Sequence, residues 1–272
     1  MKTILVATDF SKASLNAARY AIEMAAILNA SLHILHVYQL PVSYSDISYA
    51  VASGEIEKDA QNLMKEFQSQ LTNKNITDIE IKTELRLGDF IGELEKVCEK
   101  INPYLVIFGI HKSTAAQRFF FGSQAIFAMK HIEWPLVLVP EHAHFRSLNN
   151  IGIACDLIQV TETLPAEKVK MLVNDFGGKL HILNAGSNAK YHPDIVFESG
   201  LLREALPGIN HEYHFIESKD TDKGITDFVD KRDIDILLVT PKKHDFFERL
   251  FYTSHTKELA LMSNVPVMSL HI

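Results

Sequence analysis

Short apolar runs recur along the first half of the chain and alternate with longer amphipathic stretches. Five of the runs are typical of strands: "ILVAT" (4–8), "SLHILHVY" (31–38), "DIEIKTEL" (78–85), "YLVIFGI" (104–110) and "PLVLVP" (135–140). Between them lie helical patterns such as residues 14–30, in which four apolar positions share one face: Leu15, Ala18, Ile22 and Ala25. Several runs are continuously apolar, which is typical of parallel strands covered by helices on both faces. The pattern therefore predicts a doubly wound α/β unit of five strands and four helices.

The chain repeats itself. "KTILVATDFSKAS" aligns with "NNIGIACDLIQVT" and matches Asp9 to Asp156 at an offset of 147, while His33 matches His181 at an offset of 148. Further on, "GIHKSTAAQRFFFGS" aligns with "TPKKHDFFERLFYTS" and matches Ser123 to Ser254 at an offset of 131. The sequence thus indicates a tandem duplication, with 17 residues deleted from the middle of the second copy.

The second copy follows the same plan of strands. Its expected strands are "IGIAC" (151–155), "KLHILNA" (179–185), "HEYHFI" (211–216), "DILLVT" (235–240) and "PVMSL" (266–270). The polar stretch "EHAHFRSLNN" (141–150) between the copies is the natural linker. We therefore expect two domains, at residues 1–142 and 148–272, each with a five-stranded parallel sheet.

Composition narrows the class of protein. The 272 residues are 47% hydrophobic and 22% charged, which is typical of folded domains. A net charge of −7 gives no global reason to expect a nucleic-acid or membrane partner. Cys98 and Cys155 form no CxxC pair, and no segment has the apolar length of a signal-peptide core or membrane span. We expect a protein of the reducing cytoplasm.

In a doubly wound sheet, ligands bind outside the carboxyl ends of the strands, at the point where the strand order reverses. Asp9 ends the first strand, Gly109 ends the fourth, and Gly122-Ser123 opens the last helix. Free N–H groups at a helix N-terminus favour an anion, glycine permits close approach, and Lys112 adds charge. The alternative is that residues 109–125 are only a turn and a capped helix that connect two packed elements.

These residues carry a resemblance to the universal stress protein family that covers nearly the whole chain. Its most specific parts are "ILVATDFSKAS", the Gly-x2-Gly-x9-Gly-Ser/Thr signature whose place Gly109 to Ser123 takes, and the last strand "PLVLVP". The resemblance implies an adenine-nucleotide alpha hydrolase-like fold that binds ATP or AMP, with Mg²⁺ accompanying ATP.

The resemblance also implies roles for individual residues of the first copy. Ala7, Asp9 and Val37 would line the adenosine, and Gly109, Gly122 and Ser123 the ribose and phosphates. Lys112 stands where the family has its second glycine. Its side chain would either fill the space that the phosphates need or reach them as a counter-charge.

The second copy departs further from the signature. Thr240, Lys243 and Thr253 replace the three glycines, so that only Ser254 remains, and Pro241 stiffens the loop. Asp156 is retained, but a lone Asp at a strand end equally forms a turn or caps a helix. We expect the second copy to have lost nucleotide binding.

Metal and catalytic motifs are weak in this sequence. Among the thirteen histidines, "HAH" (142–144) is interpreted as a solvated pair, and His211 and His214 point to opposite faces of a strand. His33 and His181 are expected to pack in the second strand of each copy with a backbone or water partner. We therefore predict no metal site. The Walker, GxSxG and HExxH motifs are absent.

Three functions follow as hypotheses. The first is a cytoplasmic stress-response protein that binds one adenine nucleotide in the first copy and signals to an unidentified protein partner, with at most slow hydrolysis. The second is a partner-binding scaffold whose two pockets are both degenerate, and the third is a nucleotide hydrolase. Residues 136–139 and 267–270 are expected to pair antiparallel around a pseudo-two-fold axis, because bare apolar edges aggregate. Any further homodimer would use other surfaces.

Overall fold

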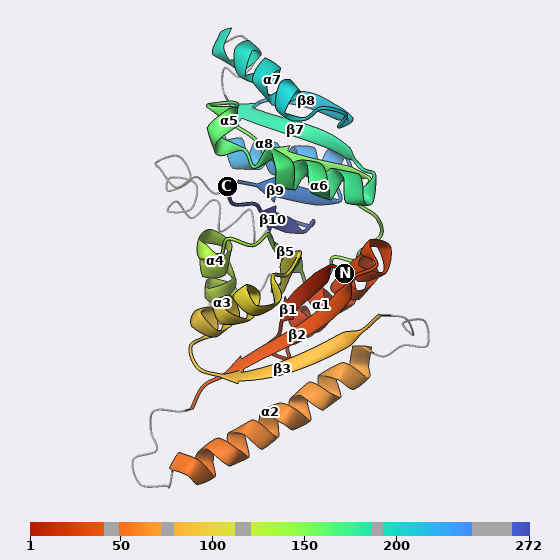
Figure 1. The fold of residues 1–272 in the computed structure, drawn as a ribbon. Helices are drawn as coiled ribbons and strands as arrows, with labels where there is room; N and C mark the ends of the chain where they lie inside the picture. Colours follow the sequence, from red (N-terminus) through yellow and green to blue (C-terminus); the bar gives the residue numbers. More distant parts are fainter. Residues whose placement is uncertain (41–48, 72–78, 112–120, 187–192, 241–262) are drawn as a thin grey trace.

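The computed structural model describes residues 1–40, 49–71, 79–111, 121–186, 193–240 and 263–272 (Figure 1). The elements of the first copy are β1 (Thr3–Ala7), α1 (Lys12–Leu28), β2 (Ser31–Tyr38), α2 (Tyr49–Leu71), β3 (Ile81–Leu87), α3 (Phe90–Ile101), β4 (Leu105–Ile110), α4 (Phe121–His131) and β5 (Leu136–Pro140). This is the predicted alternation of strands and helices, with boundaries that differ by a few residues.

The second copy repeats the order of strands, with a shorter connection between its second and third strands. Its elements are β6 (Asn150–Ala154), α5 (Val160–Thr163), α6 (Ala166–Phe176), β7 (Lys179–Gly186), α7 (Pro193–Ala205), β8 (His211–Glu217), α8 (Thr221–Lys231), β9 (Ile236–Val239) and β10 (Val267–Ser269). The predicted deletion falls in the helix between the second and third strands, since α2 has 23 residues and α7 has 13.

All ten of these strands form one sheet, in the order β3-β2-β1-β4-β5-β10-β9-β6-β7-β8 (Figure 1). Strands within each copy pair in parallel. The order reverses between β1 and β4 in the first copy and between β6 and β9 in the second. The predicted doubly wound architecture is therefore confirmed.

The two copies meet through β5 and β10, which pair antiparallel as predicted. Leu138 lies opposite Val267, and Val137 lies opposite Met268. Val137 and Met268 enter the core on one face of the sheet, while Leu138 and Val267 enter the core on the other. The strand that would be an apolar edge in each copy is thus covered by the other copy, and both cores extend across the join.

The segment between the copies is more than a polar linker, which corrects the prediction made from its composition. Phe145 is buried, with its ring 5.0 Å from that of Tyr20 on α1 and 6.3 Å from that of Phe176 on α6. Asn16 on α1 donates hydrogen bonds to the carbonyl oxygens of Pro140 and Ala143. The segment therefore fixes a helix of each copy against the join.

Two further findings concern membrane-spanning helices and the cysteines. In the described ranges, no helix combines the length and the apolarity that crossing a bilayer requires. Cys98 is buried, and neither Cys98 nor Cys155 is joined in a disulfide.

Candidate functional site

The reversal of strand order between β1 and β4 brings the predicted nucleotide residues of the first copy to one edge of the sheet. Ala7 is the last residue of β1 and is fully buried, and Asp9 follows it at the surface. Val37 lies near the carboxyl end of β2 and is half-buried. Gly109 lies in β4, next to β1. The structure thus brings these four residues together at the predicted edge.

The remaining predicted residues belong to the segment after β4. Gly122 and Ser123 lie in the first turn of α4, which begins at Phe121. The free N–H groups of a first helical turn are suited to phosphate oxygens. Lys112 lies outside the described residues, so its role stays a prediction.

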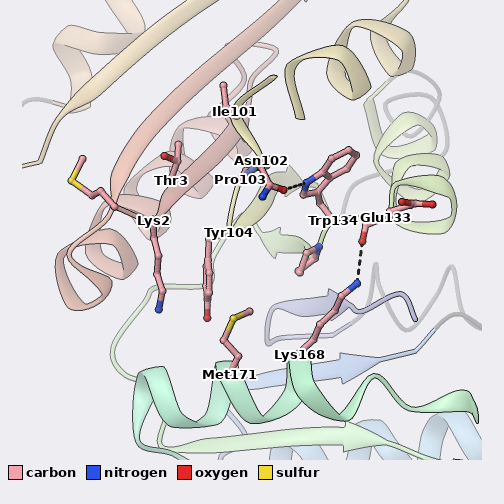
Figure 2. A pocket seen from close by; sticks show the side chains of 12 residues that line it. Lys2, Thr3, Ile101, Asn102, Pro103, Tyr104, Glu133, Trp134, Lys168 and Met171 are labelled. Atoms are coloured by element: carbon pink, nitrogen blue, oxygen red, sulfur yellow. Dashed lines mark hydrogen bonds between the residues drawn. The ribbon is translucent and has the colours of Figure 1, made fainter. Parts of the chain in front are cut away.

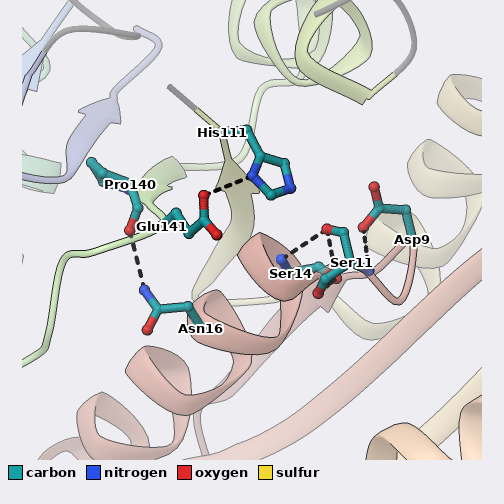
Figure 3. A network of polar contacts seen from close by, with 7 residues as sticks. All are labelled: Asp9, Ser11, Ser14, Asn16, His111, Pro140 and Glu141. Carbon is teal, nitrogen blue, oxygen red and sulfur yellow. Dashed lines mark hydrogen bonds and ion pairs between the residues drawn. The ribbon is translucent and has the colours of Figure 1, made fainter. Parts of the chain in front are cut away.

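Asp9 forms a turn at the entrance to α1 (Figure 3). Its Oδ1 accepts a hydrogen bond of 3.0 Å from the backbone N–H of Ser11, while the described residues donate none to Oδ2. Ser11 is the N-cap of α1, and its hydroxyl oxygen accepts from the N–H of Ser14. The Asp9 carboxylate therefore shapes the turn through one oxygen.

The turn after β1 is held by two buried hydroxyls and a histidine. Thr8 Oγ1 donates to Ser14 Oγ at 2.9 Å and accepts from the backbone N–H of Phe10. His36 Nδ1 donates to the Thr8 carbonyl oxygen at 2.7 Å, and burial lowers the pKa of this ring below its usual value. Phe10 takes a left-handed backbone with φ 63° and places its ring over that of His36, with centroids 4.2 Å apart. The β1–α1 turn is thus held by side-chain hydrogen bonds and contains one residue with a strained backbone.

Gly109 has a packing role that the motif alone did not reveal. A Cβ at this position would lie 2.2 Å from the carbonyl oxygen of Ala13 and 2.6 Å from the backbone nitrogen of Ser14. These are atoms of the α1 backbone, so the helix sits directly on the glycine. Gly109 is therefore required for the contact of α1 with β4, whether or not a nucleotide is bound.

Sequence reasoning did not select His111 and Glu141, which lie at the same edge. His111 follows β4 and Glu141 follows β5, and their Nδ1 and Oε2 atoms are 2.8 Å apart (Figure 3). β4 and β5 are adjacent parallel strands, so polar residues directly after them must meet. The pair could therefore have been predicted from the sequence, because each residue directly follows an apolar run that was expected to form one of two adjacent parallel strands.

The second copy keeps the turn but differs in the helix after it. Asp156 Oδ1 accepts from the N–H of Ile158 at 3.2 Å, and Leu157 has the left-handed backbone of its counterpart. The first helix then stops after four residues, and α6 begins only after Pro165. Thr240, which is buried, takes the place of the glycine in β4. A side chain at this position is incompatible with the close approach that α1 makes over Gly109 in the first copy.

Comparison with known proteins identifies the duplicated unit. The model of the universal stress protein family matches residues 1–140 and again residues 149–271. The chain belongs to the universal stress protein family. The two matches cover nearly the whole chain, so each half is a separate copy of the family's domain.

Relatives support this assignment at the level of the fold. A universal stress protein of Methanocaldococcus jannaschii is 29% identical over 142 residues, covering 51% of this chain and 81% of that protein. The crystal structure of a universal stress protein from Archaeoglobus fulgidus superposes with a TM-score of 0.74 at 19% identity, covering 99% of this chain and 98% of that chain. A functionally unknown protein from Pseudomonas aeruginosa gives a TM-score of 0.55 at 13% identity, with 100% and 92% covered. The tandem arrangement thus recurs in solved structures.

A cavity of about 600 Å³ lies where the two copies meet (Figure 2). Lys2, Tyr104 and Trp134 line it from the first copy, and Lys168 and Met171 line it from α6 of the second. It opens beside the amino ends of β1, β4 and β5, at the other end of the strands from the predicted nucleotide residues. Within the cavity, Lys168 Nζ donates a hydrogen bond of 2.7 Å to the backbone carbonyl oxygen of His271. This cavity is therefore separate from the edge of the sheet where the nucleotide residues are predicted.

Proposed function

We propose that the first copy binds an adenine nucleotide, ATP or AMP, at the carboxyl edge of β1, β2 and β4. The observation that carries this proposal is the strand-order reversal, because it gathers Asp9, Val37 and Gly109 at one edge. Family membership supports the same edge. ATP would bring Mg²⁺ with it, since its phosphates carry enough charge to require a counter-ion.

The second copy is proposed to bind no nucleotide. It retains the aspartate turn, which Asp9 and Asp156 share, so the turn itself does not distinguish the copies. The copies differ in the helix after the turn and in the loss of all three glycines, including the one now replaced by Thr240. One site per chain follows from this difference.

We propose a role in binding and signalling, with hydrolysis at most slow and incidental. A hydrolase needs a nucleophile that a base can activate. The hydroxyls of Thr8 and Ser14 at this edge are buried and hydrogen-bonded to each other, which gives them a structural role. The nucleotide would bias the conformation or the partner choice of a cytoplasmic stress-response protein.

A partner-binding scaffold without nucleotide is the second candidate. The requirement for Gly109 is explained by packing alone, and Lys112 replaces a glycine of the family signature. In addition, α7 exposes Val196 and Phe197, whose side chains are 73% and 65% accessible. Exposed apolar side chains of this size on one helix favour a protein partner.

The two candidates are separated by whether the purified chain carries nucleotide. Denaturing the protein and analysing the supernatant by chromatography should release ATP or AMP in an amount that approaches one per chain. Asp9→Ala should abolish that retention, whereas Asp156→Ala, which removes the equivalent turn in the second copy, should leave it unchanged. A chain that releases no nucleotide and takes up none when ATP or AMP is added would favour the scaffold.

A further inference from the structure

Three potential metal ligands converge on the second copy, on one face of β7 and β8. His181 Nδ1 lies 2.9 Å from His214 Nε2, and Glu212 Oε2 lies 3.9 Å from the same His214 nitrogen. One ligand atom from each residue lies within 4.8 Å of the other two. His181 pairs in register with Glu212, so all three side chains leave the sheet on the same side. Two imidazoles and one carboxylate form a donor set that suits a first-row transition metal.

We predicted no metal site because we compared the spacing of histidines only within single strands. His211 and His214 do lie on opposite faces, but His181 on the neighbouring strand supplies the second imidazole. The expectation that His181 has a backbone or water partner was wrong, because its two ring nitrogens contact the side chains of His214 and Asn150. The site depends on strand pairing, which sequence spacing does not show.

Asn150 fixes the orientation of the His181 ring. Asn150 Nδ2 donates to the carbonyl oxygen of Asp233 at 3.3 Å, which turns the amide oxygen of Asn150 toward His181. His181 Nε2–H therefore donates to that oxygen at 3.2 Å, and Nδ1 keeps its lone pair. A ligating histidine that donates its other N–H to an oxygen is the usual arrangement at metal centres.

The geometry needs little change to accept an ion. Two ligands at the usual Zn–N distance of about 2.0–2.1 Å with a tetrahedral angle are roughly 3.4 Å apart. The two histidine nitrogens, now 2.9 Å apart, would separate by about half an ångström, and His214 would carry its proton on Nδ1 instead of Nε2.

The first copy offers an internal comparison. At the position of His181 it has His33, whose Nε2 lies 2.9 Å from Glu84 Oε2. Glu84 also contacts Arg86 and Lys100, so a network of opposite charges satisfies it. The register places Lys82 and Glu84 on β3 where β8 has Glu212 and His214. At these paired positions of the described strands, the second copy combines two histidines with a carboxylate and the first copy does not.

We propose that His181, His214 and Glu212 of the second copy bind a divalent transition metal ion, with Zn²⁺ as the expected occupant. The site lies toward the amino ends of β7 and β8, away from the nucleotide edge of the first copy. It therefore stands whether or not the chain binds nucleotide. Glu212 is about half exposed, which leaves a path for the ion and a water ligand.

Lys179 limits the affinity of this site. Its Nζ lies 2.6 Å from Glu212 Oε2 and lowers the pKa of that carboxyl, so an incoming ion must displace the ammonium group. Arg232, whose guanidinium lies over the ring of Phe228 beside His214, adds a second positive charge nearby. Removing Lys179 should therefore strengthen binding, by roughly two- to fivefold for an exposed pair of this kind. Removing Lys179 would also strengthen nonspecific binding of cations to a negative surface. Variants of the proposed ligands are therefore needed to show that the ion binds at this site.

The test is a Zn²⁺ titration of the tag-free, full-length chain in competition with a colorimetric chelator. The expected stoichiometry is one ion per chain. Glu212→Gln and His214→Gln should each weaken binding at least about tenfold, since even removing a group that orients a ligand weakens affinity by about 10–100-fold. His211→Gln is the matched control, because this histidine lies on the opposite face of β8 and donates to the carbonyl oxygen of Ile209. It should leave the affinity unchanged.

Both ligand variants are chosen to fold. The Glu212 side chain is 46% accessible, and a glutamine at 214 can still donate to His181 Nδ1. Co²⁺ serves as a second probe, because tetrahedral ligation gives visible absorption that Glu212→Gln should change. If the wild-type chain takes up no Zn²⁺ at micromolar concentration, the proposal is wrong. It is equally wrong if Glu212→Gln binds as well as wild type, or if His211→Gln weakens binding as much as His214→Gln.

Discussion

Replacing Gly109 by alanine should destabilise the first copy even in the absence of any ligand. The added methyl group would lie 2.2 Å from the Ala13 carbonyl oxygen and 2.3 Å from the Ala13 carbonyl carbon. Real Cβ contacts are never this short, so α1 must move away from β4. Because the clashing atoms belong to the backbone of a helix, no side-chain rotation can relieve the contact.

The magnitude follows from two contributions. Overpacking a core costs about 1–3 kcal/mol, and a clash with backbone belongs at the upper end of that range. A helix that moves outward also stretches the buried hydrogen bond of 2.9 Å between Thr8 and Ser14, for about 1 kcal/mol more. We therefore expect Gly109→Ala to lower the free energy of unfolding by roughly 3–4 kcal/mol.

Urea unfolding followed by tryptophan fluorescence measures this loss. Trp134 is the single tryptophan of the chain and precedes β5, so its emission reports on the first copy. With a slope of about 1–3 kcal/mol per molar urea, the midpoint should fall by roughly 1 M or more. Gly200→Ala in α7 is the control, because no described atom outside the neighbouring backbone of its own helix lies within 4 Å of the added Cβ. An unchanged midpoint for Gly109→Ala would refute the packing role and restore the purely phosphate-binding interpretation of this glycine.

Four further outcomes test other parts of the structure. Cysteines at Leu138 and Val267, in a background without the native cysteines, should form an intramolecular disulfide on mild oxidation, whereas intermolecular products alone would contradict the strand pairing. Phe145→Ala should destabilise the chain by about 3 kcal/mol in the same urea assay, as deletion of a buried ring does. Burial lowers the pKa of His36 in the folded chain, so its contribution to the free energy of unfolding should be fully present above the unfolded-state pKa of about 6.5 and decrease as the pH falls below that value. In urea unfolding curves recorded at a series of pH values, His36→Gln should reduce this decrease. Calorimetry on Lys112→Ala should show weaker ATP binding with unchanged adenosine binding if this lysine reaches the phosphates, and tighter ATP binding if it blocks them; no change for either ligand would remove it from the site.

The fold could be predicted because its signals are local and repeated. Continuously apolar runs such as residues 104–110 identify parallel buried strands, and the duplication supplies each boundary twice. The pairing of β5 with β10 followed from the need to cover two equivalent apolar edges. Both features depend on the period and position of apolar residues, which can be read directly from the sequence.

The sites were harder to predict because they depend on distances between segments that are far apart in the chain. The glycine at 109 was assigned to phosphate approach from its motif, yet the atoms it accommodates belong to α1. His181 and His214 are 33 positions apart and meet only through the register of β7 and β8. Phe145 belongs to a polar stretch but is buried, because a helix from each copy packs against its ring. In each case a tertiary contact decides the role of the residue.

Nucleotide binding by the first copy alone is best tested by its stoichiometry, measured by titrating ATP and AMP into nucleotide-free protein in a calorimeter. We expect one site per chain, which is lost in Gly122→Val and in Asp9→Ala and retained in Asp156→Ala. Two sites per chain, or a single site that Asp156→Ala abolishes while Asp9→Ala does not, would contradict this assignment.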